Sequence, residues 1–457
     1  MSMKFRFPVA VAILLTFAVK SFGQGGRMGL YIDRDRQPDA GIYLPAPPDT
    51  CSLTYVDDFL QWQWGKTMRS SARGEQANDE SLWGPQEMMT IYSQALGIEI
   101  NRENTPALYK LIFRSTYTGD QSTKSAKEKY MRTRPFAQYN EHPWGRHDNE
   151  NDLRHNGSYP SGHTGIGWTN ALILAEVAPE LQDTVLRRGF QYGESRIIVA
   201  AHYQSDVDAG YLCASACVAV MHSVPDFIED LEAARAEFLE KSKLKSGVVT
   251  GYPDGRRILA QPVDTASYRY YGDVTQYLAS KAERYSSRGM QARTDADYTY
   301  EAILSSFSAP LGVRIDPVKT PNLAALVREG RNALVRNASD LSNASAFRKR
   351  PYVQIGDSSF LSESDSILSV TSSYPSVQSE TGWGIALLLS EIAPERANEL
   401  LSRGFETGRS AVINGQNWAS DVQAARLMAA ATVARLHSDA AFSKLLRDAR
   451  KEYISLK

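Results

Sequence analysis

Three short motifs carry the residue types needed to hold a tetrahedral oxyanion and to attack it. In chain order they contain a lysine with an Arg-Pro pair, a Pro-Ser-Gly-His run, and a Ser-Arg pair followed by His and Asp. Cations and amides can hold the oxyanion, one imidazole can attack it and another can move a proton. The candidate site residues are Lys127, Arg134, Ser161, Gly162, His163, Arg196, His202 and Asp206.

Lys127 and Arg134 are seven residues apart, which is about two helical turns. A helix across this segment would direct both cations from one face. Pro135 disfavours helical geometry at the residue before it, so we expect Arg134 at the end of that helix, facing a cleft. The alternative is an ordinary solvated basic face, since other basic residues lie nearby: Lys124, Lys129 and Arg132.

The Pro160-Ser161-Gly162-His163 run follows a turn-forming segment and precedes a helical pattern, which predicts the start of a helix. Gly162 lets the backbone approach a ligand, and free amides at a helix start favour an anion. His163 would then lie at the rim, where an imidazole with a pKa near ~6.5 suits a general acid. Taken alone, the tetrapeptide is equally compatible with an ordinary helix N-cap.

Ser195-Arg196, His202 and Asp206 are predicted to lie on one helical stretch, with Ser195 and His202 two turns apart on the same face. Asp206 would lie one turn beyond His202 and accept a hydrogen bond from its Nδ1–H. That bond would fix the tautomer and leave Nε2 free as a nucleophile. A surface His/Asp pair is the alternative for this motif alone.

The elements that position these residues are predicted to be helices. Segments 165–178, 181–201 and 205–223 repeat apolar residues with helical spacing, and alternating strand patterns are scarce. We therefore expect an all-α fold made of helical bundles.

An internal repeat organises the chain. Residues 71–77, 95–100 and 171–180 resemble residues 286–292, 310–315 and 386–395, and each pair is offset by 215 positions. The repeat predicts two copies of one domain, at residues 51–240 and 266–457. A Gly- and Pro-containing linker at residues 241–265 joins them, and an extended segment at residues 24–50 precedes the first copy.

The first 23 residues are predicted to be a signal peptide. Lys4 and Arg6 precede an apolar run over residues 7–19, and small residues follow it. An uncleaved anchor is the alternative. Cleavage near Gly23 would give a periplasmic or secreted protein, and we expect no membrane span in the mature chain because no later stretch is long and apolar enough.

Composition excludes several classes of partner. The formal net charge is −1, which argues against nucleic acid as a partner. Hydrophobic residues make up 42% and charged residues 23% of the chain, as in globular proteins. The three cysteines, Cys51, Cys213 and Cys217, have no zinc-site spacing, so we expect no structural metal, and their redox state is left open.

Together the motifs resemble those of the type 2 phosphatidic acid phosphatase (PAP2) superfamily. The stretches SAKEKYMRTRPFAQY (125–139), NGSYPSGHT (156–164) and HYQSDVDAG (202–210) are similar to those of the bacterial class A nonspecific acid phosphatases. The resemblance covers nearly the whole first copy and continues more weakly over the second.

The resemblance implies metal-free, cofactor-free hydrolysis of small-molecule phosphomonoesters in two steps. His202 would attack phosphorus and form a phosphohistidine, with Asp206 orienting it, and His163 would protonate the leaving alcohol and then activate water. The phosphate oxygens would be held by Lys127, Arg134, Ser161, Gly162 and Arg196. Phosphoryl transfer to other alcohols, the physiological substrate and the pH optimum are left open.

The second copy has lost most of these groups. Asn343 stands in place of the lysine, Val377-Gln378 in place of Gly-His, Ala411 in place of the arginine and Asn417 in place of the nucleophilic histidine. We therefore expect residues 266–457 to be catalytically inactive and to take the place of a partner subunit in an intramolecular pseudo-dimer. A further homo-oligomer is left open.

Three other functions are compatible with parts of the pattern. A vanadium-dependent haloperoxidase resembles this superfamily in its oxyanion pocket, although the NGSYPSGHT context is that of a phosphatase. A lipid or polyprenyl phosphate phosphatase is disfavoured by the lack of membrane helices. A non-enzymatic scaffold fits the second copy but not the first, which has every reactive group.

Overall fold

Helices and connecting loops make up the computed structural model, which describes residues 29–145, 150–242 and 251–457. Within these ranges there is no strand, so the predicted all-α fold is confirmed. The predicted signal peptide lies outside the described residues. We refer to residues 29–242 as the first half and to residues 251–457 as the second half.

The first half contains twelve of the described α-helices and two 3-10 turns, at Arg34–Arg36 and Pro179–Leu181. Prolines at the first position of several helices and the left-handed Gly97 at the end of α4 mark helix boundaries in the usual way. The helices are α1 (Ala40–Tyr43), α2 (Tyr55–Met68), α3 (Ala72–Asp79), α4 (Pro85–Leu96), α5 (Pro106–Gln121), α6 (Lys124–Tyr130), α7 (Pro135–Gln138), α8 (Glu150–Arg154), α9 (Gly162–Val177), α10 (Gln182–Ile198), α11 (Gln204–Met221) and α12 (Pro225–Lys241).

The second half repeats much of this order. For example, α9 and α20 begin 215 residues apart (377 − 162), and so do α10 and α21 (397 − 182). Two 3-10 turns lie at Ser362–Ser364 and Pro394–Arg396. The helices are α13 (Gly255–Ile258), α14 (Tyr268–Lys281), α15 (Ser287–Asp295), α16 (Tyr300–Leu311), α17 (Pro321–Ala344), α18 (Pro351–Ile355), α19 (Asp365–Leu368), α20 (Val377–Ile392), α21 (Ala397–Ile413), α22 (Ala419–His437) and α23 (Ala440–Ser455).

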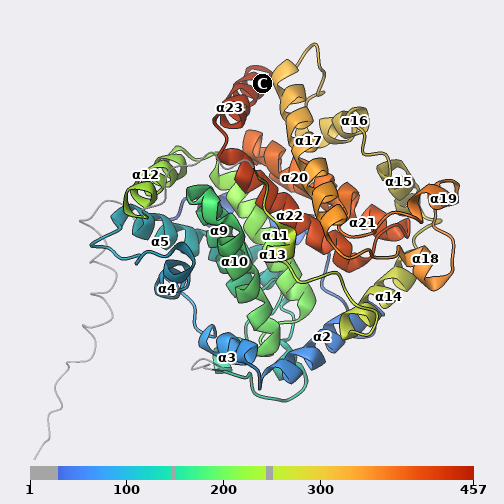
Figure 1. Ribbon diagram of the computed structural model, residues 1–457, viewed down its shortest axis with the longest axis horizontal. Coiled ribbons are helices and arrows are strands. Elements are labelled where there is room, and N and C mark those ends of the chain that lie inside the picture. Colours follow the sequence, from blue (N-terminus) through green and yellow to red (C-terminus); the bar gives the residue numbers. More distant parts are fainter. Residues whose placement is uncertain (1–28, 146–149, 243–250) are drawn as a thin grey trace, which may run out of the picture.

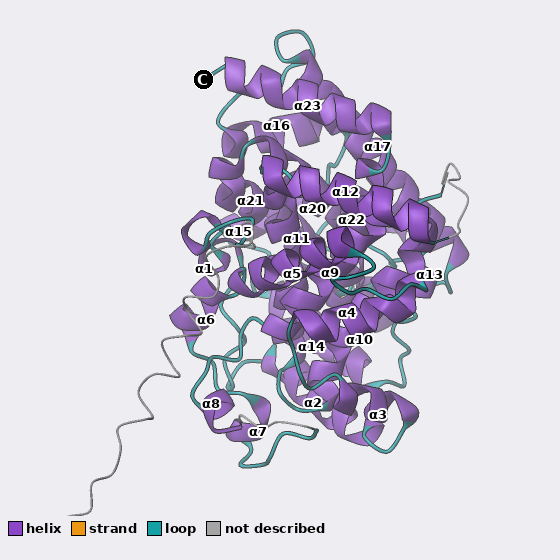
Figure 2. Ribbon diagram, turned by 90° about the vertical axis from the view of Figure 1, so that its left-hand side faces the viewer, coloured by secondary structure: helices purple, strands orange, loops and turns teal. Residues whose placement is uncertain are grey.

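Helices α9, α11, α20 and α22 form the centre of the molecule, with the remaining helices of each half outside them (Figure 1; Figure 2). Every residue of α9 from Thr164 to Val177 is buried, and so is every residue of α20 from Gln378 to Ile392. A helix that is apolar on all sides needs such a central place. One continuous apolar core therefore runs through both halves.

Residues that are 215 positions apart meet where the two halves join. Gly272 in α14 lies against Asp57 in α2, and a Cβ on Gly272 would come within 2.1 Å of the carboxylate. The side-chain amide of Gln423 donates to the carbonyl oxygen of Asp208 at 3.3 Å. Each of these contacts therefore joins two positions that correspond in the internal repeat.

A third contact of this kind joins His222 and His437, whose rings stack with centroids 3.8 Å apart. When equivalent residues of two units meet each other, the interface has the form of an isologous, two-fold contact. At these three pairs the contact between the halves has that form in the described part of the chain.

The segments before α1 and α13 each cross to the opposite half. The backbone N–H of Asp39 donates to Asn398 Oδ1 of α21 at 2.8 Å, and the backbone N–H of Asp254 donates to Asp183 Oδ1 of α10 at 2.9 Å. Asp39 and Asp254 are 215 positions apart, and so are their acceptors Asp183 and Asn398. Part of the segment predicted as a linker thus forms a helix-bearing arm that matches the extended segment at residues 24–50.

No single helix of the described residues is long and apolar enough to cross a bilayer. Helices α11 and α12 meet that length and composition only when taken together, and they are bent by 98° at the break between them.

Candidate active site

Lys127 lies in α6, and Arg134 lies just before α7, so the prediction of one helix carrying both was wrong. Helix α6 ends at Tyr130, and the next residue, Met131, has a left-handed backbone with a φ of 42°. Arg134 is extended, with φ −71° and ψ 152°, and precedes α7. Pro135 excludes the helical conformation at Arg134, so the chain turns there instead of completing a second helical turn.

Two of the three neighbouring basic residues pair with carboxylates instead of forming a solvated face. Lys124 pairs with Asp120 at 2.9 Å, and Arg132 lies between two carboxylates, described below. Lys129 is exposed and donates to the carbonyl oxygen of Gly41. Lys127 differs from Lys124 and Arg132 in having no carboxylate among its hydrogen-bond partners in the described structure.

His202 lies in the loop between α10 and α11, so the predicted single helical stretch from Ser195 to Asp206 was also wrong. Helix α10 ends at Ile198, and Ala200 takes a left-handed conformation with a φ of 60°. The carboxylate of Asp206 then caps the start of α11 by accepting from the backbone N–H of Tyr203 at 2.9 Å. The break brings His202 and Asp206 together across the cap rather than along a helix face.

The tautomer of His202 follows from its partners. Arg134 NH1 lies 2.8 Å from His202 Nε2, and a guanidinium can only donate, so Nε2 accepts and carries a lone pair. The proton of the neutral ring is then on Nδ1, which lies 3.5 Å from Asp206 Oδ2 and 3.3 Å from Ser158 Oγ. The geometry thus matches the tautomer that the sequence predicted.

Burial keeps the ring of His202 neutral. Its exposed fraction is 2%. Burial, followed by the positive charges of Arg134 and Lys127, lowers the pKa of His202 well below its usual value, against the opposing pull of Asp206. The ring therefore keeps its Nε2 lone pair in mildly acidic solution.

Asp206 is held by two residues that the sequence motifs did not single out. Arg132 NH1 donates to Oδ1 at 2.6 Å, and Ser158 Oγ donates to Oδ2 at 2.5 Å. Burial disfavours the charge of Asp206, but Arg132 and then His202 outweigh burial and lower its pKa. Arg132 also donates to Asp58 Oδ2 at 2.6 Å, which fixes the guanidinium between two carboxylates.

The three predicted phosphate-binding cations are buried and bonded to backbone carbonyls. Lys127 Nζ donates to Gly157, Arg134 NH1 to Ala201 and Arg196 NH1 to Glu80, each at 2.9 Å. Their exposed fractions are 7%, 5% and 1% in the same order. Within the described residues none of the three forms an ion pair with a carboxylate.

Such unneutralised charge is costly to bury. Burial lowers the pKa of Arg134 and of Arg196 to about 10. Burial, and then the neighbouring charge of Arg134, lowers the pKa of Lys127 well below its usual value. A cluster of buried cations without their own counter-charges is a site prepared for an anion.

The Pro-Ser-Gly-His run starts α9, as predicted. Ser161 is the N-cap, with its Oγ accepting from the backbone N–H of Thr164 at 3.4 Å, and Gly162 is the first helical residue. The backbone N–H of Ser161 donates to the carbonyl oxygen of Asp206 at 2.8 Å, which joins this motif to the third one. A Cβ on Gly162 would lie 3.8 Å from Lys127 Cε, so α9 begins beside the lysine.

His163 is half-buried at this helix start. Its Nε2 lies 3.2 Å from the carbonyl oxygen of Ser81, and its ring packs on Tyr192. Burial, followed by the charges of Arg196 and His202, lowers the pKa of His163 well below its usual value. His163 therefore lies within reach of the charges of the other two motifs, and the structure gathers all eight predicted site residues in one region.

The corresponding region of the second half keeps the supporting contacts without the reactive groups. Arg348 bridges Asp273 and Asp421 as Arg132 bridges Asp58 and Asp206. Asn417 instead donates its side-chain amide to the carbonyl oxygen of Ser373 at 2.5 Å, and Gln378 donates to that of Thr407 at 2.9 Å. The amides that replace the two histidines are thus engaged with the backbone.

Comparison with known proteins places the first half in a family. The model of the PAP2 superfamily matches residues 109–229. The non-specific acid phosphatase of Providencia stuartii is 41% identical over 214 residues, which cover 47% of this chain and 86% of that protein. The non-specific acid phosphatase of Salmonella typhimurium is 39% identical over 206 residues, or 45% of this chain and 82% of that protein. The acid phosphatase of Zymomonas mobilis is 37% identical over 205 residues, or 45% and 77%.

The chain therefore belongs to the PAP2 superfamily and, within it, to the non-specific acid phosphatases. The predicted resemblance is confirmed. These relatives each align with about half of this chain.

Proposed function

We propose that this acid phosphatase hydrolyses phosphomonoesters in two steps through a phosphohistidine at His202. The observation that carries the proposal is the tautomer of His202. Its Nε2 holds a lone pair beside the guanidinium of Arg134, while Nδ1–H faces Asp206 and Ser158. A nucleophilic nitrogen is thus oriented into a group of buried cations that has no anion of its own.

In the first step His202 Nε2 attacks phosphorus and the bond from phosphorus to the ester oxygen breaks. Arg134 exchanges its contact with Nε2 for a phosphate oxygen, and Lys127 and Arg196 hold the others with the amides at the start of α9. Fixed donors of this kind stabilise the charge on a transferring phosphoryl group. The imidazolium formed at His202 is stabilised by the carboxylate of Asp206.

His163 supplies the proton for the leaving alkoxide. In the empty site its pKa is lowered by burial and by the charges of Arg196 and His202. A bound phosphate adds negative charge beside the ring and raises that pKa, so the ring becomes protonated when substrate is present. In the second step neutral His163 takes a proton from water, the water oxygen bonds to phosphorus, and His202 leaves. An alcohol in place of water gives phosphoryl transfer.

The proposal is tested with His202→Ala and a matched change in the second half, Asn417→Ala. We expect kcat with a chromogenic phosphomonoester to fall by ~10⁴-fold or more in the first variant and to stay unchanged in the second. Wild-type enzyme quenched with alkaline detergent should carry phosphate in an acid-labile, base-stable linkage that His202→Ala lacks. An unlabelled wild-type enzyme, or full activity of His202→Ala, contradicts the phosphohistidine.

Three further assays test the alternatives and the transfer to alcohols. Turnover should persist after dialysis against a chelator, and loss of turnover would reject metal-free chemistry. Halide oxidation by peroxide in the presence of vanadate, without phosphatase turnover, would favour the haloperoxidase. Added glycerol should give glycerol phosphate if the intermediate also transfers to alcohols.

Export is a second part of the proposal. The basic residues and apolar run at the N-terminus support a signal peptide at residues 1–23 and a periplasmic or secreted enzyme. Expression of the full chain in a Gram-negative host, followed by N-terminal sequencing of the periplasmic fraction, tests this. A chain that keeps Met1 and stays with the cytoplasm contradicts it.

We further propose that the chain arose by tandem duplication and folds as a pseudo-dimer with an inactive second copy. The three contacts between residues 215 positions apart and the reciprocal crossing of the two arms support this. Residues 24–262 expressed alone should be poorly soluble or self-associate, because one face of the buried core would be open to water. A stable, fully active monomeric fragment contradicts the proposal.

A further inference from the structure

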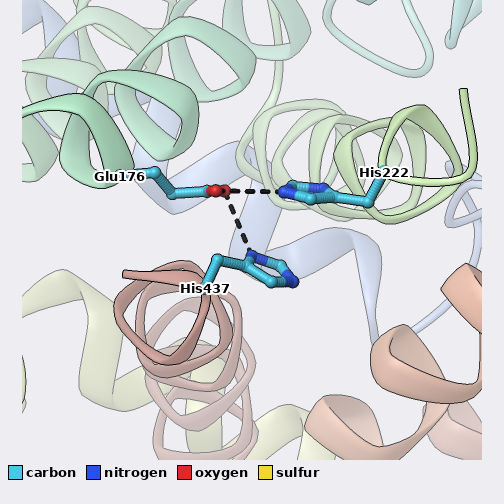
Figure 3. Close-up of side chains that lie close together, drawn as sticks. All are labelled: Glu176, His222 and His437. Carbon is cyan, nitrogen blue, oxygen red and sulfur yellow. Dashed lines mark hydrogen bonds and ion pairs between the residues drawn. The ribbon is translucent and has the colours of Figure 1, made fainter. Parts of the chain in front are cut away.

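Four ionisable side chains form a buried cluster where the two halves meet, and in the first half it lies at the opposite ends of α9 and α11 from the active-site motifs. Glu176 and Glu391 lie near the C-terminal ends of α9 and α20, and His222 and His437 at those of α11 and α22. We call these four residues the junction cluster. Figure 3 shows the carboxylate of Glu176 facing both imidazoles. The side chains are at most 7% exposed.

The junction cluster has the same two-fold form. Glu176 and Glu391 differ by 215 positions, as do His222 and His437. In each half the histidine Nε2 contacts the glutamate of its own half, at 3.0 Å for His222 and at 2.9 Å for His437. His437 Nδ1 then contacts Glu176 Oε1 at 3.3 Å and so links the second half to the first.

Every ring nitrogen in the cluster lies near an acceptor oxygen. His222 Nδ1 lies 2.9 Å from the carbonyl oxygen of Val218, and the Nε2 atoms of both histidines are hydrogen-bonded to carboxylates. His437 Nδ1 lies 3.3 Å from Glu176 Oε1 as an ion pair, without the alignment of a hydrogen bond. A neutral imidazole has one N–H, so two neutral rings could pair only two of these four acceptors. Two imidazolium rings supply four N–H groups, and two glutamates balance their charge.

A bound metal ion fits this arrangement less well. Its ligand nitrogens would have to direct their lone pairs to one point about 2.0–2.1 Å from each. The two rings are stacked with an interplanar angle of 19°, and nearly parallel rings direct their in-plane lone pairs side by side rather than toward one point. The stacked geometry therefore favours protons over a shared cation.

Few other charged groups are near the cluster. The edge of Phe227 from α12 and apolar residues of the central helices surround the rings, chiefly Leu172, Val218, Leu387 and Val433. From α23, Arg450 donates to the carbonyl oxygen of Ser223. From α12, Asp226 lies 3.8 Å from Arg114 rather than against the rings. The charge balance of the cluster therefore depends on its own four members.

We propose that the junction cluster fastens the two halves of this chain in acidic solution, when His437 is protonated between Glu391 and Glu176, and loosens as that ring loses its proton. Glu391, Glu176, His222 and His437 would then act as an acid-dependent clasp between the catalytic half and the half that has lost its catalytic groups. The enzyme's junction would be strongest under the conditions in which an acid phosphatase works.

The direction of the pH dependence follows from the cluster's own shifts. Burial opposes the charge of His437, but Glu391 and Glu176 outweigh it and raise its pKa well above the usual value. A histidine whose pKa is raised on folding contributes stability that is complete below about pH 6.5. This stability is lost as the pH rises through the pKa of the histidine in the folded protein. For Glu176, burial is outweighed by His222 and His437, and its pKa falls to about 2. The stability that Glu176 contributes is complete above about pH 4.5 and is lost as the pH falls toward 2.

The first test uses the unmodified full chain. With ¹⁵N-labelled histidine, the ring nitrogens of His437 should keep imidazolium shifts at pH 6 to 7. A neutral His437 ring at pH 6 would overturn the proposal. Zinc added to the chelator-treated protein at pH 7.5 should not raise the melting temperature. A rise that His437→Gln abolishes would make the cluster a metal site and also overturn it.

The second test compares variants. The wild-type melting temperature should exceed that of His437→Gln by several degrees more at pH 5.5 than at pH 9, while His155→Gln should match wild type at both. The variant's phosphatase activity below its melting temperature should remain, which separates this proposal from the one for the active site. A difference between His437→Gln and wild type that is the same at both pH values would overturn the clasp.

Discussion

Four donors share the charge of one buried carboxylate at the reacting end of the molecule. Asp206 accepts from Arg132, Ser158, the backbone of Tyr203 and the ring of His202. The first three leave the carboxylate no freedom to turn, so its remaining lone pair fixes the plane of His202. Since Arg348 holds Asp421 in the same way without a histidine to orient, this framework serves folding first and catalysis second.

The two arginines provide a matched experiment. Arg132→Met and Arg348→Met each leave two carboxylates buried without their cation, which costs about 3–5 kcal/mol of stability. We expect a similar fall in the free energy of unfolding for both, measured by urea denaturation. Only Arg132→Met should also lower kcat at a temperature where both variants are folded. Equal activity of the two variants would mean that Asp206 needs no such anchor.

Lys127 sets the acid limit of the reaction through His202. Its positive charge is among the causes that lower the pKa of His202, after burial and Arg134. Lys127→Met removes that charge, so the pKa of His202 rises and more of the ring is protonated at low pH. The acid limb of kcat/KM should therefore move to higher pH, in addition to a loss of phosphate binding.

Rate measurements from pH 3.5 to 7.5 check this, with Lys124→Met as the control. Lys124 lies on the same helix but pairs with Asp120, so its removal should leave the limb in place. If the acid limb of kcat/KM does not move in Lys127→Met, His202 does not titrate between pH 3.5 and 7.5.

The types of the site residues were predictable from the sequence, but not the backbone that carries them. The sequence around His202 has no glycine or proline to announce the end of α10, and the left-handed turn falls on an alanine, Ala200. Only the capping of α11 by Asp206 shows why the helix stops. Arg132 and Ser158 were likewise unremarkable, because a buried ion pair between distant segments leaves no periodic pattern.

At the scale of elements, α9 and α20 occupy equivalent central places with one notable difference. Position 165 of α9 is glycine, whereas the equivalent position in α20 is Glu380. Glu380 is fully buried, its Oε2 has no hydrogen-bond partner, and within the described residues its side chain is hydrogen-bonded only to Asn337 and Thr432, at 3.4 and 3.5 Å. Burial raises its pKa well above the usual value, which favours the neutral acid in the folded protein.

Replacing Glu380 with methionine should stabilise the protein by about 1–3 kcal/mol at neutral pH, because a poorly paired polar group leaves the core. The loss of stability that Glu380 causes in the wild type is smallest below about pH 4.5, where this residue is also protonated in the unfolded chain. The loss grows as the pH rises. The gain measured by thermal unfolding should therefore increase from pH 4 to pH 8. Glu301→Met, at an exposed position of α16, is the control and should change stability by less than about 0.5 kcal/mol. A gain that does not depend on pH would contradict a buried neutral acid.

At the scale of the whole molecule, the sequence repeat predicted which segments correspond but not how they meet. Periodicity identifies buried faces without naming their partners, and the partner of α2 is α14 in the opposite half. There Gly272 allows the helix backbone to approach the carboxylate of Asp57. The crossing of the two arms was equally invisible, because it depends on hydrogen bonds between residues 359 and 71 positions apart.

Gly272→Ala tests this approach. The added methyl group would meet Asp57 Oδ1 at 2.1 Å and Cβ at 2.8 Å, so one helix must shift. We expect a loss of about 1–3 kcal/mol in the free energy of unfolding. Gly251→Ala meets nothing within 4 Å and should be close to neutral, which makes it the matched control. If both variants unfold alike, the two helices do not pack as closely as described.

The local two-fold contact lies within one covalent chain, and this changes how it responds to dilution. Two separate subunits come apart as their concentration falls, whereas linked ones keep a fixed effective concentration of each other. In the pseudo-dimer proposed above, the two copies stay paired one to one, even as a few molecules in a large volume. A substitution on one side of the contact also leaves the other side untouched, so the two faces are free to diverge and fit each other as unlike surfaces.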